Sequence, residues 1–353
     1  MTRMTHENSM TKQSRFWSLT AMLGAGALAL TACGGDGESD ASSGGDGDLD
    51  EVSLMLNWYP YGEHAPYYYG VDEGIFEDHG IDLEIQAGQG STRTVQAIGT
   101  GEADFGWADT APLMSNIDQG VSVKSVGVFL QTTPSAVQFF SDSGIEEPAD
   151  LEGKTIAVSA GDAPTSTFPQ YLEEAGVDAD AVNQQNLDPA GKVSAVISGQ
   201  VDGLIGFAHD QGPQIEDESG DDVSYLRYSD VGLNFYSNGL LASQSTIDDD
   251  SDLVERMVAA TSEAFDAAVE DPEAAAGAME GEDPQLPAQS VVVEQWKQTS
   301  EILTTENSEG EAPGWNAAED WENTISVMAE AELIDEEKPV ETYYDDSFAP
   351  EGE

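Results

Sequence analysis

The aromatic cluster between Asn57 and Tyr69 is the part of this sequence best suited to hold a small ring compound. Six of these thirteen residues are aromatic, whereas aromatic residues make up 8% of the 353-residue chain. Aromatic faces stack on planar ligands, and the Asn57 amide and the His64 imidazole can form hydrogen bonds with the edge of such a ring. We therefore expect Trp58 and Tyr59 to contact a ligand, with Asn57 and His64 at its edge.

Tyr67 begins a run of three tyrosines that follows these residues. The run falls on an expected helix, where consecutive side chains face different sides. Some of these rings therefore pack in the core, and Tyr67 stays open between core packing and a ligand contact.

Further polar candidates stand where a strand-like run ends or a helix-like run begins. Ser91 and Asp162 precede expected helices, whose free N–H groups can hold a polar ligand group, although both residues could equally be ordinary helix caps. Asp109 follows the strand-like run 104–107 and could meet a ligand donor or cap the next helix. Phe207 ends the strand-like run 203–207 and Asp210 follows it, so both are candidates at the carboxyl end of an expected strand.

The charge of the chain excludes several classes of partner. The sequence has 69 acidic and 11 basic side chains, which gives a net charge of −58. Nucleic-acid binding requires clustered basic residues, so we expect no nucleic-acid partner. Arg93 is the only base that we expect near the candidate loops, which favours a neutral, amine-bearing or weakly cationic ligand. The spread of acids over linker, loops and helix faces predicts a surface adapted to a saline habitat.

The sequence contains no set of residues that points to catalysis or to a metal. Cys33 is the only cysteine, which excludes a disulfide framework and a cysteine-based metal site. The four histidines lack the spacing of metal ligands. We therefore expect no catalytic residue, no metal and no cofactor.

The N-terminus has the pattern of an export signal. Basic residues precede a short apolar run that is too short to span a bilayer, and small residues then precede Cys33. This pattern predicts a signal peptide over 1–32, lipidation of Cys33 and a flexible linker over 33–50 that is rich in Gly, Ser and Asp. We expect an exported protein that is anchored by lipid to the outer face of the cytoplasmic membrane.

The candidate residues lie on a repeated strand–loop–helix plan. Strand-like runs at 52–56, 83–86, 155–158 and 203–207 alternate with helix-like runs, and the segments 101–104 and 199–202 resemble each other. Alternating strands and helices predict an α/β fold with mainly parallel sheets, whose ligands bind beyond the carboxyl ends of the strands. We expect two such lobes with a ligand cleft between them, and a helical C-terminal part from Leu253 onward.

Several runs of this sequence resemble a known family of binding proteins. The Asn-Trp-Tyr-Pro run at 57–60 and the His-Ala-Pro-Tyr run at 64–67 are similar to the opening of substrate-binding proteins of thiamine-pyrimidine-precursor importers. Further runs that resemble this family are at 74–76, 80–83, 101–106 and 148–154. The runs at 101–106 and 148–154 also resemble sulfonate, taurine and nitrate binders of the same superfamily.

The resemblance implies a two-lobed type II periplasmic-binding-protein fold that delivers its ligand to an ABC permease with its ATPase. Lobe 1 would comprise 51–135 and 239–353, and lobe 2 would comprise 136–238, with hinge crossings near 132–135 and 236–239. By this analogy Asp210 would be the second-lobe acid that meets the amine of the ligand ring.

The resulting hypothesis is a monomeric, non-enzymatic solute-binding lipoprotein for a thiamine pyrimidine precursor of the formylaminopyrimidine or hydroxymethylpyrimidine type. The alternative is a binding protein for sulfonate, taurine or nitrate. A pyrimidine-synthesising enzyme is a remote alternative, since such an enzyme needs a Schiff-base lysine near the aromatic cluster. The body of this chain has no lysine before Lys124. A surface adhesin would explain neither the repeated loops nor the clustered rings.

Overall fold

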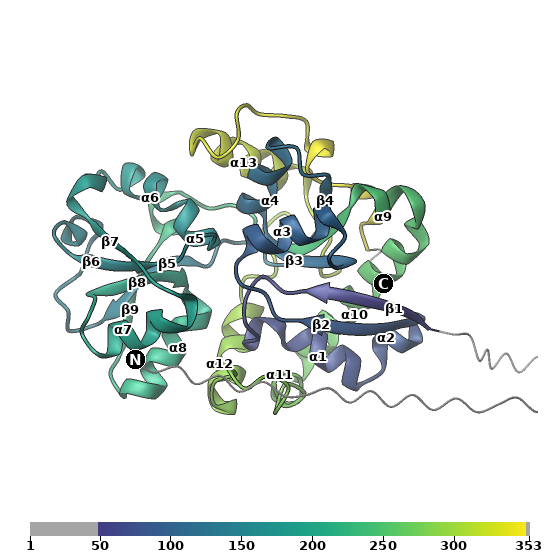
Figure 1. The fold of residues 1–353 in the computed structure, drawn as a ribbon, viewed down its shortest axis with the longest axis horizontal. Helices are drawn as coiled ribbons and strands as arrows, with labels where there is room; N and C mark the ends of the chain where they lie inside the picture. The colour runs from purple at the N-terminus through teal and green to yellow at the C-terminus, as the bar shows by residue number, and fades with distance from the viewer. Residues whose placement is uncertain (1–48, 351–353) are drawn as a thin grey trace, which may run out of the picture. The chain divides into compact units, whose positions relative to one another are not determined.

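Two five-stranded β-sheets organise the computed structural model, which describes residues 49–350 (Figure 1). The first sheet has the order β2-β1-β3-β10-β4, with β1 (Asp50–Met55), β2 (Ile81–Gln86), β3 (Phe105–Asp109), β4 (Val123–Val128) and β10 (Asn238–Ser243). The second has the order β7-β6-β8-β5-β9, with β5 (Ser135–Phe140), β6 (Thr155–Val158), β7 (Asn183–Asn186), β8 (Gly203–Phe207) and β9 (Val223–Arg227).

Both sheets are mixed and follow the same design. In the first sheet β1 is parallel to β2 and β3, while β10 runs antiparallel between β3 and β4. In the second sheet β6 is parallel to β7 and β8, while β5 runs antiparallel between β8 and β9. The α/β class and the strand–loop–helix repeat are confirmed. The expectation of mainly parallel sheets also holds, because four of the five strands in each sheet run in one direction and a single strand, β10 or β5, runs against them. Strands that arrive from the other sheet enter each sheet in the opposite direction.

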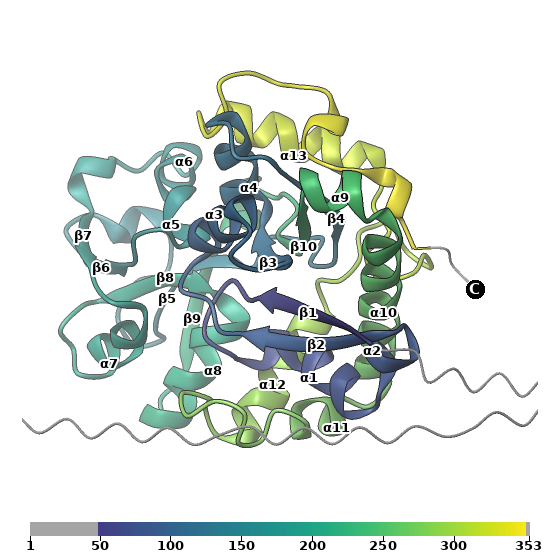
Figure 2. The same ribbon diagram turned by 45° about the vertical axis from the view of Figure 1, so that its right-hand side comes forward.

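Helices connect the parallel strands and cover the sheets (Figures 1 and 2). The helices before β10 are α1 (Ala65–Asp72), α2 (Ile75–Asp78), α3 (Ser91–Thr100), α4 (Thr110–Asp118), α5 (Ala163–Ser166), α6 (Phe168–Glu174), α7 (Lys192–Ile197) and α8 (Ala208–Ser219). The helices after β10 are α9 (Gln244–Asp249), α10 (Ser251–Glu270), α11 (Pro272–Gly277), α12 (Gln289–Ser300) and α13 (Ala318–Glu330). The chain is thus helical after β10, which agrees with the expected helical C-terminal part.

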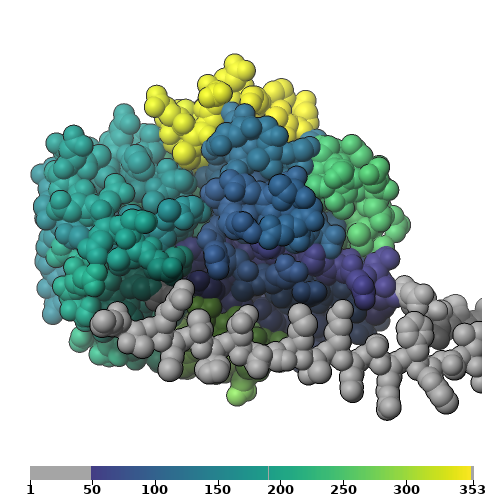
Figure 3. All heavy atoms as spheres, viewed as in Figure 1, coloured from purple at the N-terminus to yellow at the C-terminus, as the bar shows by residue number. Residues whose placement is uncertain are grey.

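The chain crosses twice between the two sheets, and the crossings are joined to each other. The first crossing connects β4 to β5, and the second connects β9 to β10. The N–H groups of Phe129 and Leu130 both donate to the carbonyl oxygen of Asn238, and the Ser237 N–H donates back to Leu130 at 2.9 Å. All described residues belong to one compact unit, and the two sheet regions meet on the face seen in Figure 3.

The parts of the chain before residue 49 lie outside the described residues. These parts include the expected signal peptide, Cys33 and almost all of the expected linker, so all three stay predictions. None of the helices within 49–350 has the length and apolar character that a membrane span requires.

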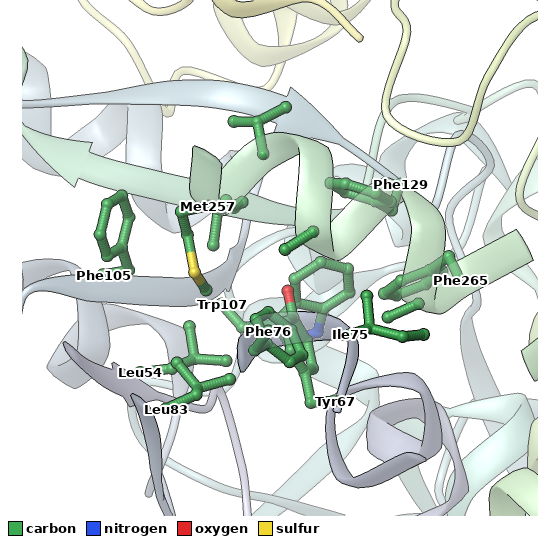
Figure 4. Close-up of a cluster of buried hydrophobic side chains, with 14 of the residues drawn as sticks. Leu54, Tyr67, Ile75, Phe76, Leu83, Phe105, Trp107, Phe129, Met257 and Phe265 are labelled. Atoms are coloured by element: carbon green, nitrogen blue, oxygen red, sulfur yellow. The ribbon is translucent and has the colours of Figure 1, made fainter. Parts of the chain in front are cut away.

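The core of the first sheet is an aromatic cluster around Phe265 of α10 (Figure 4). The Phe265 ring centroid lies 4.7 Å from that of Phe129, 5.5 Å from that of Trp107 and 5.8 Å from that of Trp296. All four rings are fully buried. The helix α10, far along the chain from β1 and β3, therefore completes the core beneath these strands.

Phe265→Ala should lower the free energy of unfolding by about 3–5 kcal/mol, because the cavity it leaves is bounded by rigid rings that cannot close it. Chemical denaturation monitored by circular dichroism measures this loss. Val269→Ala on the same helix is the matched control, since Val269 is 43% exposed and should change the stability by less than about 0.5 kcal/mol. Equal effects of the two substitutions would contradict the assignment of this core.

Candidate functional site

A small cavity lies where the ends of parallel strands from the two sheets approach one another. It measures about 20 Å³, which is room for about one water molecule. Its walls come from the segments after β1, β2 and β6, from the end of β8 and from the first turn of α8, as expected for ligand sites in α/β sheets. The residues that line this inner cavity are Asn57, Trp58, Tyr61, Ser91, Asp162, Ala163, Gly206, Phe207, Asp210 and Gln211.

A larger outer cavity of about 240 Å³ shares part of this wall. Trp58, Tyr61, Asp210 and Gln211 line both cavities. The remaining walls of the outer cavity are mostly amide, proline and aromatic side chains, and they include Tyr59. Trp58 and its neighbours thus separate two adjoining spaces.

Glycine allows the two sides to approach closely at the inner cavity. A Cβ on Gly90, whose φ is +116°, would lie 2.9 Å from the carbonyl oxygen of Gly161 in the opposite loop. Any side chain at position 90 would therefore push the walls apart. The Gly-containing loops identified in the sequence meet at this point.

His64 supports Asn57 and does not line either cavity. The His64 ring is fully buried, and burial lowers its pKa to about 4, so the ring is neutral at pH 7. Its Nε2 lies 2.8 Å from Asn57 Oδ1, and its Nδ1 lies 3.4 Å from the Tyr61 backbone nitrogen. Because Nδ1 faces a backbone N–H donor, Nε2 carries the proton and donates to Asn57. The amide nitrogen of Asn57 then keeps its N–H groups for other partners.

Tyr67 and Asp109 are also placed outside the residues that line the cavities. The fully buried Tyr67 ring packs against Trp107 and Phe265 in the core of the first sheet. The Asp109 carboxylate caps α4 by accepting the Ala111 N–H at 2.9 Å, and it also accepts the Ser237 hydroxyl at 2.7 Å. Burial raises the pKa of Asp109 to about 7 despite these donors. Tyr67 therefore packs in the core and Asp109 caps a helix, which are the alternatives to a ligand contact that the sequence left open.

Ser91 and Asp162 both line the inner cavity and have partners inside the protein. Ser91 Oγ accepts the backbone N–H of Asp109 at 3.2 Å. One oxygen of Asp162 accepts the ammonium of Lys192 at 2.7 Å. The expectation that Arg93 is the only base near the candidate loops is wrong, because Lys192 comes from α7, distant in sequence. Arg93 instead pairs with Glu102 at the surface.

Asp210 lines both cavities and is surrounded by amide donors. Its Oδ1 accepts Gln214 Nε2 at 2.7 Å and Gln295 Nε2 at 3.2 Å, and Gln211 donates to its other oxygen. Burial raises the pKa of Asp210 to about 7; Lys192 opposes this shift, and Glu63 and Asp162 add to it. Asp210 can therefore gain or lose a proton near neutral pH.

Glu63, to which no sequence pattern pointed, is a fully buried carboxylate that joins the two sides of the site. Glu63 accepts hydrogen bonds from Tyr61 Oη at 2.5 Å, Trp107 Nε1 at 2.6 Å and Asn238 Nδ2 at 2.5 Å on the first-sheet side. It also accepts from His209 Nε2 of α8, at 2.8 Å, on the second-sheet side. No local pattern shows that Glu63 is a buried acceptor, because three of its four donors come from distant segments and only Tyr61 is close to it in the sequence.

Glu63 remains ionised although burial alone would raise its pKa. The hydrogen bond and charge of His209, with further contributions from His64 and Tyr61, outweigh burial and hold the pKa of Glu63 below its ordinary value. Gln295 of α12 forms a second bridge, since its side chain accepts the Gly62 N–H at 2.9 Å and donates to the Asp210 carbonyl oxygen at 3.0 Å. Two polar bridges therefore connect the cavity walls.

Within residues 49–350, no group of three or more His, Cys, Asp or Glu side chains is arranged to hold a metal ion. The site as described can bind a flat polar molecule through aromatic faces, amides and one titratable carboxyl group. Asn57, Trp58, Ser91, Asp162, Phe207 and Asp210 come together at the inner cavity, and Tyr59 lies at the outer one.

Glu63→Gln should lower the free energy of unfolding by about 2–4 kcal/mol, because the new amide group places N–H donors against donors in a buried site. Thermal unfolding at pH 7 measures this loss. Glu77→Gln is the matched control on an exposed position of α2, and it should change the stability by less than about 0.5 kcal/mol. A fully stable Glu63→Gln protein would show that the Glu63 network does not hold the site together.

Known proteins resemble this chain over most of its length. The formylaminopyrimidine-binding protein of Halalkalibacterium halodurans is 24% identical over 307 residues, which cover 85% of this chain and 90% of that protein. A 4-amino-5-hydroxymethyl-2-methylpyrimidine phosphate synthase of Uromyces fabae is 25% identical over 192 residues, or 52% of this chain and 55% of that protein. The relatives thus include an enzyme as well as binding proteins.

The solved structure of the periplasmic aliphatic sulphonate-binding protein SsuA from Escherichia coli has the same fold, with a TM-score of 0.65 and 16% identity over 83% of this chain and 91% of that protein. The fold is therefore the two-lobed α/β fold of type II periplasmic binding proteins. A family model described as NMT1/THI5 like matches residues 62–275, more than half of the chain. The chain belongs to the NMT1/THI5-like family.

Proposed function

We propose that this solute-binding protein serves an ABC importer and that its ligand is a thiamine pyrimidine precursor of the formylaminopyrimidine or hydroxymethylpyrimidine type. The observation that carries the proposal is the inner wall itself, where Trp58, Asn57 and Asp210 offer a ring face, an amide and a titratable carboxyl group. The formylaminopyrimidine-binding relative, aligned over nearly the whole chain, supports the same ligand class.

The chemistry of the wall suits an aminopyrimidine edge. Such an edge presents a ring nitrogen that accepts a hydrogen bond beside an amine that donates one. A protonated Asp210 carboxyl group can donate to the ring nitrogen and accept from the amine at the same time. The raised pKa of Asp210, to about 7, which results first from burial, makes this protonated form accessible near neutral pH.

Binding requires the two lobes to move apart and close again. The inner cavity of about 20 Å³ is smaller than any ring ligand, and both lobes contribute to its walls. We place lobe 1 at 51–135 and 239–353 and lobe 2 at 136–238, with hinges near 132–135 and 236–239. The joined crossings between the sheets support hinge motion there, because a few residues at such crossings absorb the change in backbone angles.

The N-terminal pattern and the net charge of the protein indicate where it works. We infer that it is exported, anchored by lipid on Cys33 at the outer face of the cytoplasmic membrane, monomeric and without enzymatic activity. A permease with its ATPase would recognise the closed form. The net charge of −58 supports a saline habitat, where salt screens the repulsion between surface acids.

The alternative is an anionic ligand such as a sulfonate, taurine or nitrate. None of the described residues that line the two cavities is basic. The nearby Lys192 ammonium is already paired with Asp162 at 2.7 Å. Backbone N–H groups alone would have to hold an anion, so the aminopyrimidine is the better match.

A ligand screen by thermal shift tests this proposal. Hydroxymethylpyrimidine or formylaminopyrimidine should raise the melting temperature in a concentration-dependent manner, since a ligand that binds only the folded protein stabilises it. Taurine, an alkanesulfonate and nitrate should have no effect at the same concentrations. Stabilisation by one of these three compounds, with none by either pyrimidine, would replace the proposed ligand.

Trp58→Ala should weaken pyrimidine binding by about 1–3 kcal/mol, because the ligand would lose its stacking partner. Isothermal titration calorimetry measures the change. Trp315→Ala is the matched control, since Trp315 is half-buried and lines neither cavity. The Trp315→Ala protein should bind the pyrimidine with the affinity of the wild type. Unchanged affinity in Trp58→Ala would remove Trp58 from the proposed site.

A further inference from the structure

Lys192 is a fully buried lysine beside the inner cavity, and nothing in the proposed function uses it. Its Nζ donates to Asp162 Oδ2 at 2.7 Å and to the carbonyl oxygen of Ile205 at 2.8 Å. The same Nζ lies over the Trp58 ring, 5.3 Å from its centroid. A lysine is rarely buried completely without a partner for its charge. Two of its partners, Asp162 and Trp58, are themselves walls of the inner cavity.

The position of Lys192 restricts how a ligand can use Trp58. An ammonium group within about 6 Å of an indole face is attracted to that face. Because Lys192 occupies one face of the Trp58 ring, a ligand ring has only the opposite face for stacking. Lys192 belongs to α7, whereas Trp58 follows β1, so this contact joins the two sides of the site.

Lys192 also controls the charge of the wall. Its ammonium is balanced by Asp162, so this pair presents little net charge to a ligand. Asp210 is the other carboxyl group of the inner wall, and Lys192 is the positive charge that stabilises its ionised form. The other groups around Asp210 are the acids Glu63 and Asp162, the Tyr61 hydroxyl group and the amides of Gln211, Gln214 and Gln295.

We propose that Lys192 is the specificity-determining residue of the site: it neutralises Asp162, reserves one face of Trp58 for the ligand, and leaves Asp210 as the carboxyl group that shares a proton with an amine-bearing ring. The proposal rests on the proposed function, because it names how the same site selects a neutral aminopyrimidine over an anion. Lys192 acts as a positioning residue, through Asp162, Trp58 and Asp210.

Two measurements on Lys192→Met test the proposal. The first is a ¹³C carboxyl NMR titration of the protein without ligand, in which the Asp210 signal is assigned by its loss in Asp210→Asn. The second is the affinity for hydroxymethylpyrimidine between pH 5.5 and 8.5. Lys192→Arg keeps the positive charge, and Lys297→Met is the matched control, since Lys297 is a surface lysine paired with Glu273.

Removal of the Lys192 charge should shift the Asp210 titration to higher pH, because the ionised carboxylate loses the positive charge that stabilises it. Binding takes up a proton when Asp210 is ionised, so affinity should fall as the pH rises through the Asp210 pKa. In Lys192→Met the pH at which the affinity falls should be higher than in the wild type. The affinity at the low-pH plateau should drop by about tenfold, because Trp58 loses its cationic partner. Lys192→Arg should restore both properties, and Lys297→Met should change neither.

A double variant, Lys192→Met with Asp162→Asn, keeps the test valid if Lys192→Met alone does not fold. This variant buries no unpaired charge, and its Asp210 titration should lie between those of the wild type and Lys192→Met. An Asp210 titration that Lys192→Met and the double variant leave unchanged would overturn the proposal. If the wild type binds no aminopyrimidine, the proposed function fails, whereas a shifted Asp210 titration would still establish the control of Asp210 by Lys192.

Discussion

The buried carboxylate of Glu63 is the interaction on which the arrangement of the site depends. A carboxylate without access to water must have its charge balanced by donors. Glu63 finds them in Tyr61, Trp107 and Asn238 on one side and in His209 on the other. These donors come from four separate segments, so Glu63 is fully paired only when all four are in place. The need to pair the Glu63 carboxylate therefore also fixes the positions of the inner-cavity walls relative to each other.

The site built around this network combines rigid support with a few groups that face the ligand space. His64 orients Asn57, Gln295 holds Asp210, and Lys192 holds both Asp162 and Trp58. Each of these four wall residues thus has a buried partner behind it that lines neither cavity. This division explains why several polar residues near the site are buried although they touch no cavity. It also suits a binding protein whose ligand-contacting side chains are held in place before the ligand arrives.

Sequence patterns identified the parallel strand–loop–helix units well, because these units are local. The run at 155–158, the run at 203–207 and the helix from Ser91 to Thr100 agree with the structure within a residue. The strands β4, β5, β7, β9 and β10 were not recognised. The last of these completes a sheet whose other strands lie more than a hundred residues earlier, and its direction depends on a crossing between the sheets. Such pairing is a property of the whole chain, which local alternation cannot reveal.

By itself, the sequence determined the α/β class, the aromatic cluster after the first strand and the candidate loops, since residue type and spacing along the chain encode these features. The tertiary structure decided which candidates face a cavity. It placed Tyr67 in the core, Asp109 at a helix cap and His64 behind Asn57. It also brought Lys192 to the site from a position that no motif marks, and it made Glu63, which lies within the aromatic cluster, the acceptor that joins the two sides. The reason is physical: burial and charge pairing depend on contacts between distant segments, and these contacts form only when the chain is folded.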